Sequence, residues 1–189
     1  MEGERRGWQW ALSAAKRDGN QEAIRELEAL APYAAPGTVL RMKDVYTQRK
    51  WVQHYGGTMA YRKNNQADSG LANLSPEYSD EESRRVWEGN AFVTPLLLPP
   101  MLARDPNISE LKVPVVLFSG RHDINVNSQV AAEWLDQLQA PSKRVVWFEH
   151  SAHMPMTEES GKFLLSLVQY VRPFAEQAGD VPPAERTGS

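Results

Sequence analysis

Two short apolar segments, separated by a helical pattern, constrain the fold of this 189-residue chain more than any other feature. Residues 113–119 (VPVVLFS) and 144–149 (RVVWFE) have the length and β-branched composition of buried strands. Between them, residues 127–139 have apolar side chains at helical spacing. A strand, a helix and a strand in this order predict a parallel pair, because parallel strands need a crossover connection. A last helix over 157–171, capped by Thr157 and stopped by Pro173, would complete a βαβα unit.

The preceding part of the chain, residues 1–110, predicts helices and loops only. Helices are expected over 4–16, 21–30 and 38–55, and a fourth begins at the capping box Ser79-Asp80-Glu81-Glu82 and ends near Gly89. Residues 94–107 are expected to form a proline-punctuated connection. We therefore predict a helical region (1–110), a βαβα part (111–175) and a flexible tail (176–189). Four tryptophans are expected in the core of the helical region: Trp8, Trp10, Trp51 and Trp87.

Composition excludes several classes of function. The chain has no cysteine, which rules out disulfides, thiolate zinc sites and a cysteine nucleophile. Its net charge of −3 and the lack of a basic cluster argue against nucleic acid as a partner. The longest apolar stretch, 91–103, is short and broken by prolines, and the charged start has no signal-peptide pattern. We expect a cytoplasmic protein without a membrane span, a cofactor or a metal.

An acid and a histidine follow the two predicted strands. Asp123 comes just after the first and His153 just after the second. Functional groups gather at the carboxyl ends of parallel strands, which lie roughly 5 Å apart. Asp123 could therefore hold the imidazole of His153 in one tautomer while the other ring nitrogen accepts a proton from a nucleophile. Taken singly, Asp123 could be a turn residue and His153 a loop residue, and the pairing favours catalysis.

The other histidines are weaker candidates for the base. His150 competes with His153, but it falls at the end of the strand itself. His122 is expected to point away from the side chain of Asp123, and His54 is expected to pack or be solvated on a helix. Apart from His150 and His153, which have the spacing His-x-x-His, no pair of histidines has a recognised metal-ligand spacing, so no metal site is expected.

Residues 114–163 (PVVLFSGRHDINVN to HSAHMPMTEESGKF) resemble the C-terminal part of the α/β-hydrolase family, in which the acid precedes the histidine and a serine precedes both. Residues 7–33, 48–57 and 75–90 resemble the helical cap of its proline iminopeptidase-like branch. The resemblance implies a partial α/β-hydrolase fold, a helical cap followed by the terminal parallel βαβα unit. It also implies Asp123 and His153 as catalytic residues. The implied substrate is an ester, an amide or a peptide with a small N-terminal residue.

The nucleophile of that family is missing. No Gly-x-Ser-x-Gly motif occurs anywhere in the 189 residues, and the His-Gly-Gly oxyanion loop is absent too. Ser119 lies in the predicted acid-bearing turn and Ser151 in the histidine loop, and neither occupies a strand-to-helix elbow. We therefore expect the chain to be inactive alone. Related epoxide hydrolases and dehalogenases use an Asp nucleophile with the same acid and histidine. Because the nucleophile is missing here, the sequence does not distinguish their reactions from that of a serine hydrolase.

Two strands form a poor sheet, with apolar edges open to pairing. We expect the chain to need a complementary chain, self-association or an N-terminal segment. The alternative is a truncated, non-catalytic module or fragment that binds or assembles with another chain. In prolyl peptidases of this branch, cap carboxylates hold the substrate amine. Glu77, Glu81 and Glu82 are available, but capping explains Glu81 and Glu82 better, and none is assigned.

Overall fold

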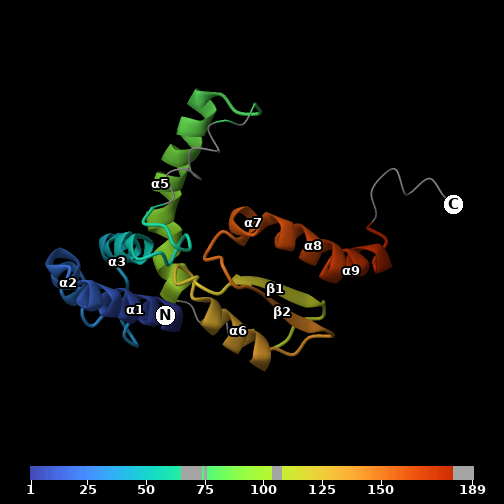
Figure 1. Ribbon diagram of the computed structural model, residues 1–189, viewed down its shortest axis with the longest axis horizontal. Coiled ribbons are helices and arrows are strands. Elements are labelled where there is room, and N and C mark those ends of the chain that lie inside the picture. The colour runs from blue at the N-terminus through green and yellow to red at the C-terminus, as the bar shows by residue number, and fades with distance from the viewer. Residues whose placement is uncertain (65–73, 75, 104–107, 181–189) are drawn as a thin grey trace.

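The computed structural model describes residues 1–64, 74, 76–103 and 108–180, and Figure 1 shows their arrangement. Strands β1 (Val115–Gly120) and β2 (Lys143–Phe148) form a two-stranded parallel sheet. The register pairs Val115 with Lys143 at one end and Gly120 with Phe148 at the other. Both strands therefore end level with each other. The predicted parallel pair is confirmed.

Helices cover both faces of this sheet (Figure 1). Helix α6 (Ser128–Gln137) lies on one face, and α7 (Pro155–Glu158) and α8 (Ser160–Tyr170) lie on the other. The ring of Phe163 on α8 stands 5.2 Å from that of Phe118 and 5.9 Å from that of Phe148, between centroids. Asn127 caps α6 by accepting a hydrogen bond of 3.2 Å from the amide of Val130. The helix predicted between the two strands is therefore confirmed.

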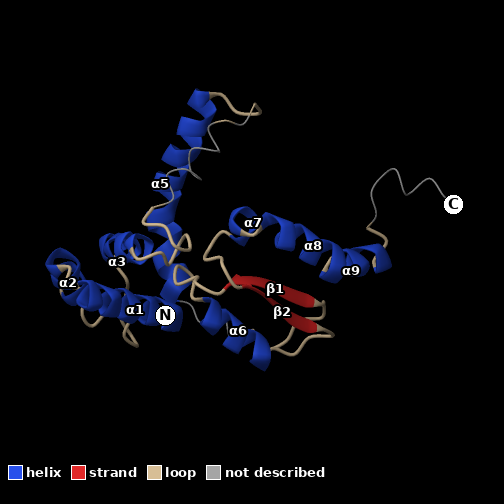
Figure 2. Cartoon of the chain, in the orientation of Figure 1, coloured by secondary structure: helices blue, strands red, loops and turns tan. Residues whose placement is uncertain are grey.

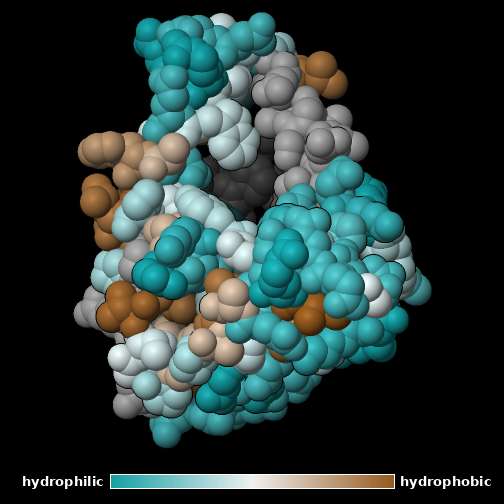
Figure 3. Space-filling model, turned by 90° about the vertical axis from the view of Figure 1, so that its left-hand side faces the viewer, coloured by the Kyte–Doolittle hydropathy of each residue, from teal (hydrophilic) through white to brown (hydrophobic). Residues whose placement is uncertain are grey.

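The helical region begins with α1 (Glu2–Asp18), α2 (Gln21–Glu28) and α3 (Met42–His54), as the pattern predicted. Gly19 ends α1 in the left-handed conformation, with φ at 68°, and Asn20 starts α2 by accepting from the amide of Ala23 at 3.1 Å. Figure 2 shows these three helices gathered together, and their inward faces make a buried core. On the outer face seen in Figure 3, brown apolar atoms interrupt a mostly teal surface. The buried members of this core are Ala11, Ala15, Ala23, Leu27, Trp51 and Val52.

Helix α5 (Asp80–Ala103) corrects two predictions. It was expected to end near Gly89, yet it continues through Gly89 and Pro95 across most of the predicted connection at 94–107, whose residues 104–107 lie outside the described part. One glycine costs a helix only about 1 kcal/mol relative to alanine, and the following Leu96 and Leu97 favour the helical conformation. Trp87 was expected in the core, but it lies on this projecting helix and is 59% exposed. Trp8, Trp10 and Trp51 pack in the core as predicted.

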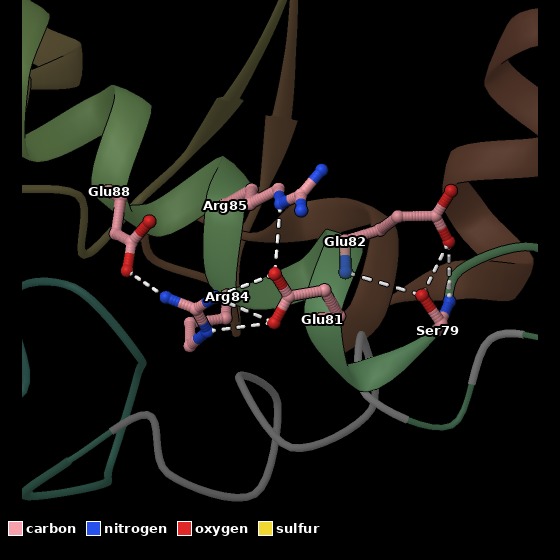
Figure 4. Close-up of polar contacts among 6 residues, drawn as sticks. All are labelled: Ser79, Glu81, Glu82, Arg84, Arg85 and Glu88. Atoms are coloured by element: carbon pink, nitrogen blue, oxygen red, sulfur yellow. Dashed lines mark hydrogen bonds and ion pairs between the residues drawn. The ribbon is translucent and has the colours of Figure 1, made fainter.

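The start of α5 was predicted correctly, and Figure 4 shows its polar contacts. The Glu82 carboxylate accepts from the backbone amide of Ser79 at 2.9 Å, and the amide of Glu82 donates to the Ser79 hydroxyl at 3.3 Å. Glu81 pairs with Arg84 and Arg85 on the same helix. Glu81 and Glu82 are therefore engaged in the helix start.

The C-terminal helices differ from the prediction. Thr157 caps no helix; it lies within α7, where its hydroxyl donates to the carbonyl of Met154 at 3.0 Å. Helix α8 ends at Tyr170, three residues before Pro173, as predicted. Pro173 itself lies in the first turn of a further short helix, α9 (Arg172–Gln177), where a missing N–H is harmless. The predicted tail 176–189 is helical up to Gln177, and residues 181–189 lie outside the described part. Leu164 is 61% exposed on α8, although the periodicity of residues 157–171 predicts that it packs with Phe163, Leu167 and Val171.

Candidate active site

The two predicted site residues meet at the ends of the parallel strands. Oδ2 of Asp123 lies 3.0 Å from Nδ1 of His153. The loops that carry Asp123 and His153 approach closely at Gly120, where a Cβ atom would stand 1.9 Å from the carbonyl oxygen of Ala152. Only glycine fits at that point. The amide of His122 also donates to the carbonyl of Ser151 at 3.0 Å, so pairing continues past both strands.

Asp123 is 7% exposed, and each of its carboxylate oxygens has its own partner. Oδ1 accepts from the amide of Val126 at 3.1 Å, while Oδ2 faces His153. A carboxylate can only accept, so Nδ1 of the imidazole carries the shared proton. This hydrogen bond raises the pKa of His153 above its ordinary value, against the opposing effect of burial.

The outer nitrogen of His153 is available for chemistry. The side chain is 36% exposed, and Nε2 has no hydrogen-bond partner among residues 1–64, 74, 76–103 and 108–180. With the proton on Nδ1, Nε2 carries a lone pair. The arrangement can therefore accept a proton from a hydroxyl or a water placed beside it.

Neither serine near the dyad is placed as a nucleophile. The Ser151 hydroxyl donates to Oε2 of Glu159 at 2.6 Å, which directs it away from the imidazole. Ser119 lies within β1, and no serine in the described part of the chain hydrogen-bonds to His153. The geometry thus agrees with the sequence, in which the elbow motif is missing.

The remaining histidines have other contacts. Nε2 of His122 lies 3.0 Å from the hydroxyl of Tyr61, and His150 is exposed in the turn after β2. The ring of His54 lies 5.4 Å from that of Trp51 and 4.8 Å from that of Tyr55. In the described segments, no group of three or more His, Cys, Asp or Glu side chains could hold a metal ion. No helix of those segments is long and apolar enough to cross a lipid bilayer.

Sequence reasoning missed the role of the turn that follows α3. The carbonyl of Gly57 accepts hydrogen bonds from the amides of Ile124 at 2.9 Å and Asn125 at 3.1 Å. The carbonyl of the next residue, Thr58, accepts one from the backbone amide of His153 at 3.0 Å. A Cβ at Gly57 would stand 2.8 Å from Cβ of Ile124. This turn therefore contacts both the acid loop and the histidine loop. The only signal in the sequence is the pair Gly56-Gly57, which directly follows the helix predicted over 38–55 and is also explained as the end of that helix.

A buried charge was missed as well. Glu4 on α1 is 6% exposed, accepts from the Tyr33 hydroxyl at 2.9 Å and pairs with Arg49 on α3. Burial, with the Glu4 carboxylate beside it, raises the pKa of Tyr33. Arg49 also donates to the amide oxygen of Gln48 at 2.8 Å. Its positive charge lies near enough to His153 to lower the pKa of that imidazole slightly against the effect of Asp123.

Comparison with known proteins gives one partial likeness. A 66-residue region is 38% identical to part of a protein described as "Probable aminopeptidase YbaC" from Bacillus subtilis (strain 168). The matched region covers 35% of this chain and 21% of the relative, so the chain matches about a fifth of that protein's length. No protein-family model matches the chain. No solved structure matches it either.

Proposed function

We propose that this chain carries the acid and the base of a serine hydrolase of the α/β-hydrolase type, in a partial fold made of a helical cap and a terminal βαβα unit. The observation that carries the proposal is the 3.0 Å contact between Asp123 and His153 at the level ends of adjacent parallel strands. The partial likeness to a probable aminopeptidase supports the hydrolase class.

The reaction would be acyl transfer. Nε2 of His153 takes the proton of a serine hydroxyl as the serine oxygen bonds to the substrate carbonyl carbon. The imidazolium then gives that proton to the leaving amine or alcohol as the scissile bond breaks. A water, deprotonated by the same nitrogen, then attacks the acyl-serine, and the imidazolium returns that proton to the serine oxygen as the acid is released. Throughout, Asp123 holds Nδ1–H and stabilises the imidazolium.

The serine would come from polypeptide outside these residues. It must reach the exposed side of His153, opposite Asp123, within a hydrogen bond of Nε2. The substrate would be a small ester or amide, or a peptide with a small N-terminal residue. The name of the relative favours the peptide.

The test is labelling with a fluorophosphonate probe, which reacts with activated serines. The chain alone should remain unlabelled. Co-expression with a segment that carries a strand, a Gly-x-Ser-x-Gly turn and a helix, cloned from DNA upstream of this reading frame, should yield labelling of that segment and ester hydrolysis. Asp123→Asn and His153→Ala should abolish the gain. Strong labelling of the lone chain would show that the nucleophile has been misidentified.

A second candidate function is that of a non-catalytic module that assembles with another chain or with itself. The apolar side chains left exposed on α8 favour it: Leu164 at 61%, Leu165 at 69% and Val168 at 49%. Isolated apolar residues are ordinary on a surface, but a cluster on one helix marks a contact site. The His153→Ala substitution should leave the partner binding of such a module unchanged. The same substitution should abolish the activity of the proposed hydrolase.

A further inference from the structure

The loop that carries His153 is held by a carboxylate that the proposed chemistry does not use. Glu158 ends α7, five residues after the histidine. Its Oε2 accepts from the amide of Ala152 at 2.8 Å, directly before His153. Its Oε1 accepts from the amide of Ala60 at 2.6 Å, in the turn after α3. One side chain thus joins two segments that are far apart in the sequence.

This contact reinforces a second link between the same segments. The amide of His153 itself donates to the carbonyl of Thr58 at 3.0 Å. The histidine loop is therefore linked to the turn at two successive residues, at Ala152 through Glu158 and at His153 directly. The same turn accepts, at Gly57, the amides of Ile124 and Asn125, next to Asp123. The relative position of the acid and the base is therefore set partly through the turn.

The chemistry of the position calls for a carboxylate of this length. Two backbone N–H groups approaching from different segments require two acceptor atoms, and hydrogen bonds to an ionised acceptor are stronger than neutral ones. A glutamine would offer one acceptor oxygen and a donor NH₂, which cannot accept the second amide. An aspartate keeps the charge, but it is one methylene too short to reach both amides without movement of the backbone.

We propose that Glu158 is a positioning residue for the dyad: by binding the amides of Ala60 and Ala152, it locks the His153 loop onto the turn after α3. The inference rests on the proposed role of His153 as a base. It makes the helical region part of the machinery that aligns Asp123 and His153. Charged groups that face the imidazole are Asp123, Arg49 and Glu158 itself.

The experiment compares E158Q and E158D with the natural chain by NMR, with E176Q on α9 as the control. The readouts are the pKa of His153 and the hydrogen-exchange protection of the amides of Ala60, Ala152 and His153. Both Glu158 variants should lose about tenfold in protection at one or more of these amides, the loss expected for one charge-assisted hydrogen bond. In both, the pKa of His153 should fall. E176Q should change neither quantity.

The two variants separate positioning from simple charge. E158D keeps the negative charge near His153, so a normal pKa and normal protection in E158D, with a change in E158Q alone, would overturn the proposal. Unchanged readouts in both variants would overturn it too. If the variants do not fold, the natural chain supplies the test: NMR couplings through the hydrogen bonds should link the amide nitrogens of Ala60 and Ala152 to the carboxylate carbon of Glu158, and their absence would refute the contact.

These measurements need no enzymatic activity. If complementation yields no labelled serine, the proposed function fails while the NMR result still reports whether Glu158 aligns the dyad. If complementation succeeds, E158D should lower kcat with little change in KM, since alignment of the base acts in the transition state.

Discussion

The backbone amide of His153 donates a 3.0 Å hydrogen bond to the carbonyl of Thr58, across 95 residues of sequence. Because Gly57, one residue earlier, accepts from the acid loop, a single turn contacts both halves of the dyad. The strand ends bring the acid and the base to the same edge, and this turn fixes how they face each other.

Replacing Asp123 with Asn should lower the pKa of His153. The hydrogen bond to the Asp123 carboxylate is the main cause that raises it, and the amide has no negative charge to stabilise the imidazolium. Titration of the imidazole Cε1–H resonance by NMR measures the change. An unchanged or raised value for His153 would contradict the electrostatic account.

Stability should depend on pH through the same imidazole. An unfolded histidine has a pKa of about 6.5, and the fold raises it, so the native state binds more protons between these two values. The stabilisation is fully present below about pH 6.5 and is lost as pH rises through the folded pKa. In urea unfolding, the difference in unfolding free energy between the natural chain and Asp123→Asn should therefore shrink as the pH rises from about 6.5 through the folded pKa of His153. A gap that widens with pH would have the wrong sign.

Gly120→Ala should strongly destabilise the sheet end. Its Cβ would lie 1.9 Å from the Ala152 carbonyl, and a clash of this kind with backbone costs about 1–3 kcal/mol or more. The matched control is Gly161→Ala in the first turn of α8, where nothing lies within 4 Å. That substitution should stabilise the chain by up to about 1 kcal/mol through helix propensity. Thermal and urea unfolding of the two variants measure the contrast, and equal effects would contradict the close approach of the two loops.

Leu165→Lys tests the exposed side of α8. Leu165 is 69% exposed, so the change should alter the free energy of unfolding by less than about 0.5 kcal/mol. If this side is a contact surface, the added charge should weaken self-association, or binding of a complementary segment. Gln137→Lys adds the same charge to an exposed polar position of α6, on the other face of the sheet, and is the control. Sedimentation velocity measures association, and identical behaviour of both variants would argue against a contact at this surface.

The sequence predicted the parts of the fold that local pattern determines. The two parallel strands, the Asn20 cap and the Ser79 capping box were all identified from short segments, and the strand order predicted that Asp123 and His153 meet. The strands are less buried than predicted: residues 115–118 of β1 are only partly buried, and Lys143 and Arg144 of β2 are exposed.

The predicted helix ends were wrong where glycine or proline interrupts a segment that otherwise favours a helix. Gly89 was given too much weight, because one glycine costs a helix little. Pro95, Pro99 and Pro100 each disfavour a helix interior, and local propensity does not explain why α5 includes them.

The contacts that align the dyad could not be predicted in the same way. Glu158 and Glu159 are typical acids of a helix start, and only the folded chain brings Glu158 to the amide of Ala60. The pairing of Glu4 with Arg49 likewise depends on how α1 packs against α3. Long-range backbone contacts such as His153 with Thr58 have no residue signature, because any residue can make them.

The tautomer of His153 is the most direct measure of whether Asp123 prepares this imidazole to accept a proton. Above its pKa, ¹⁵N NMR of the ring should show the proton on Nδ1, bound to Asp123, with Nε2 bare and able to receive one. A neutral imidazole with its proton on Nε2 would contradict the account, because the nitrogen meant to act as the base would already be occupied.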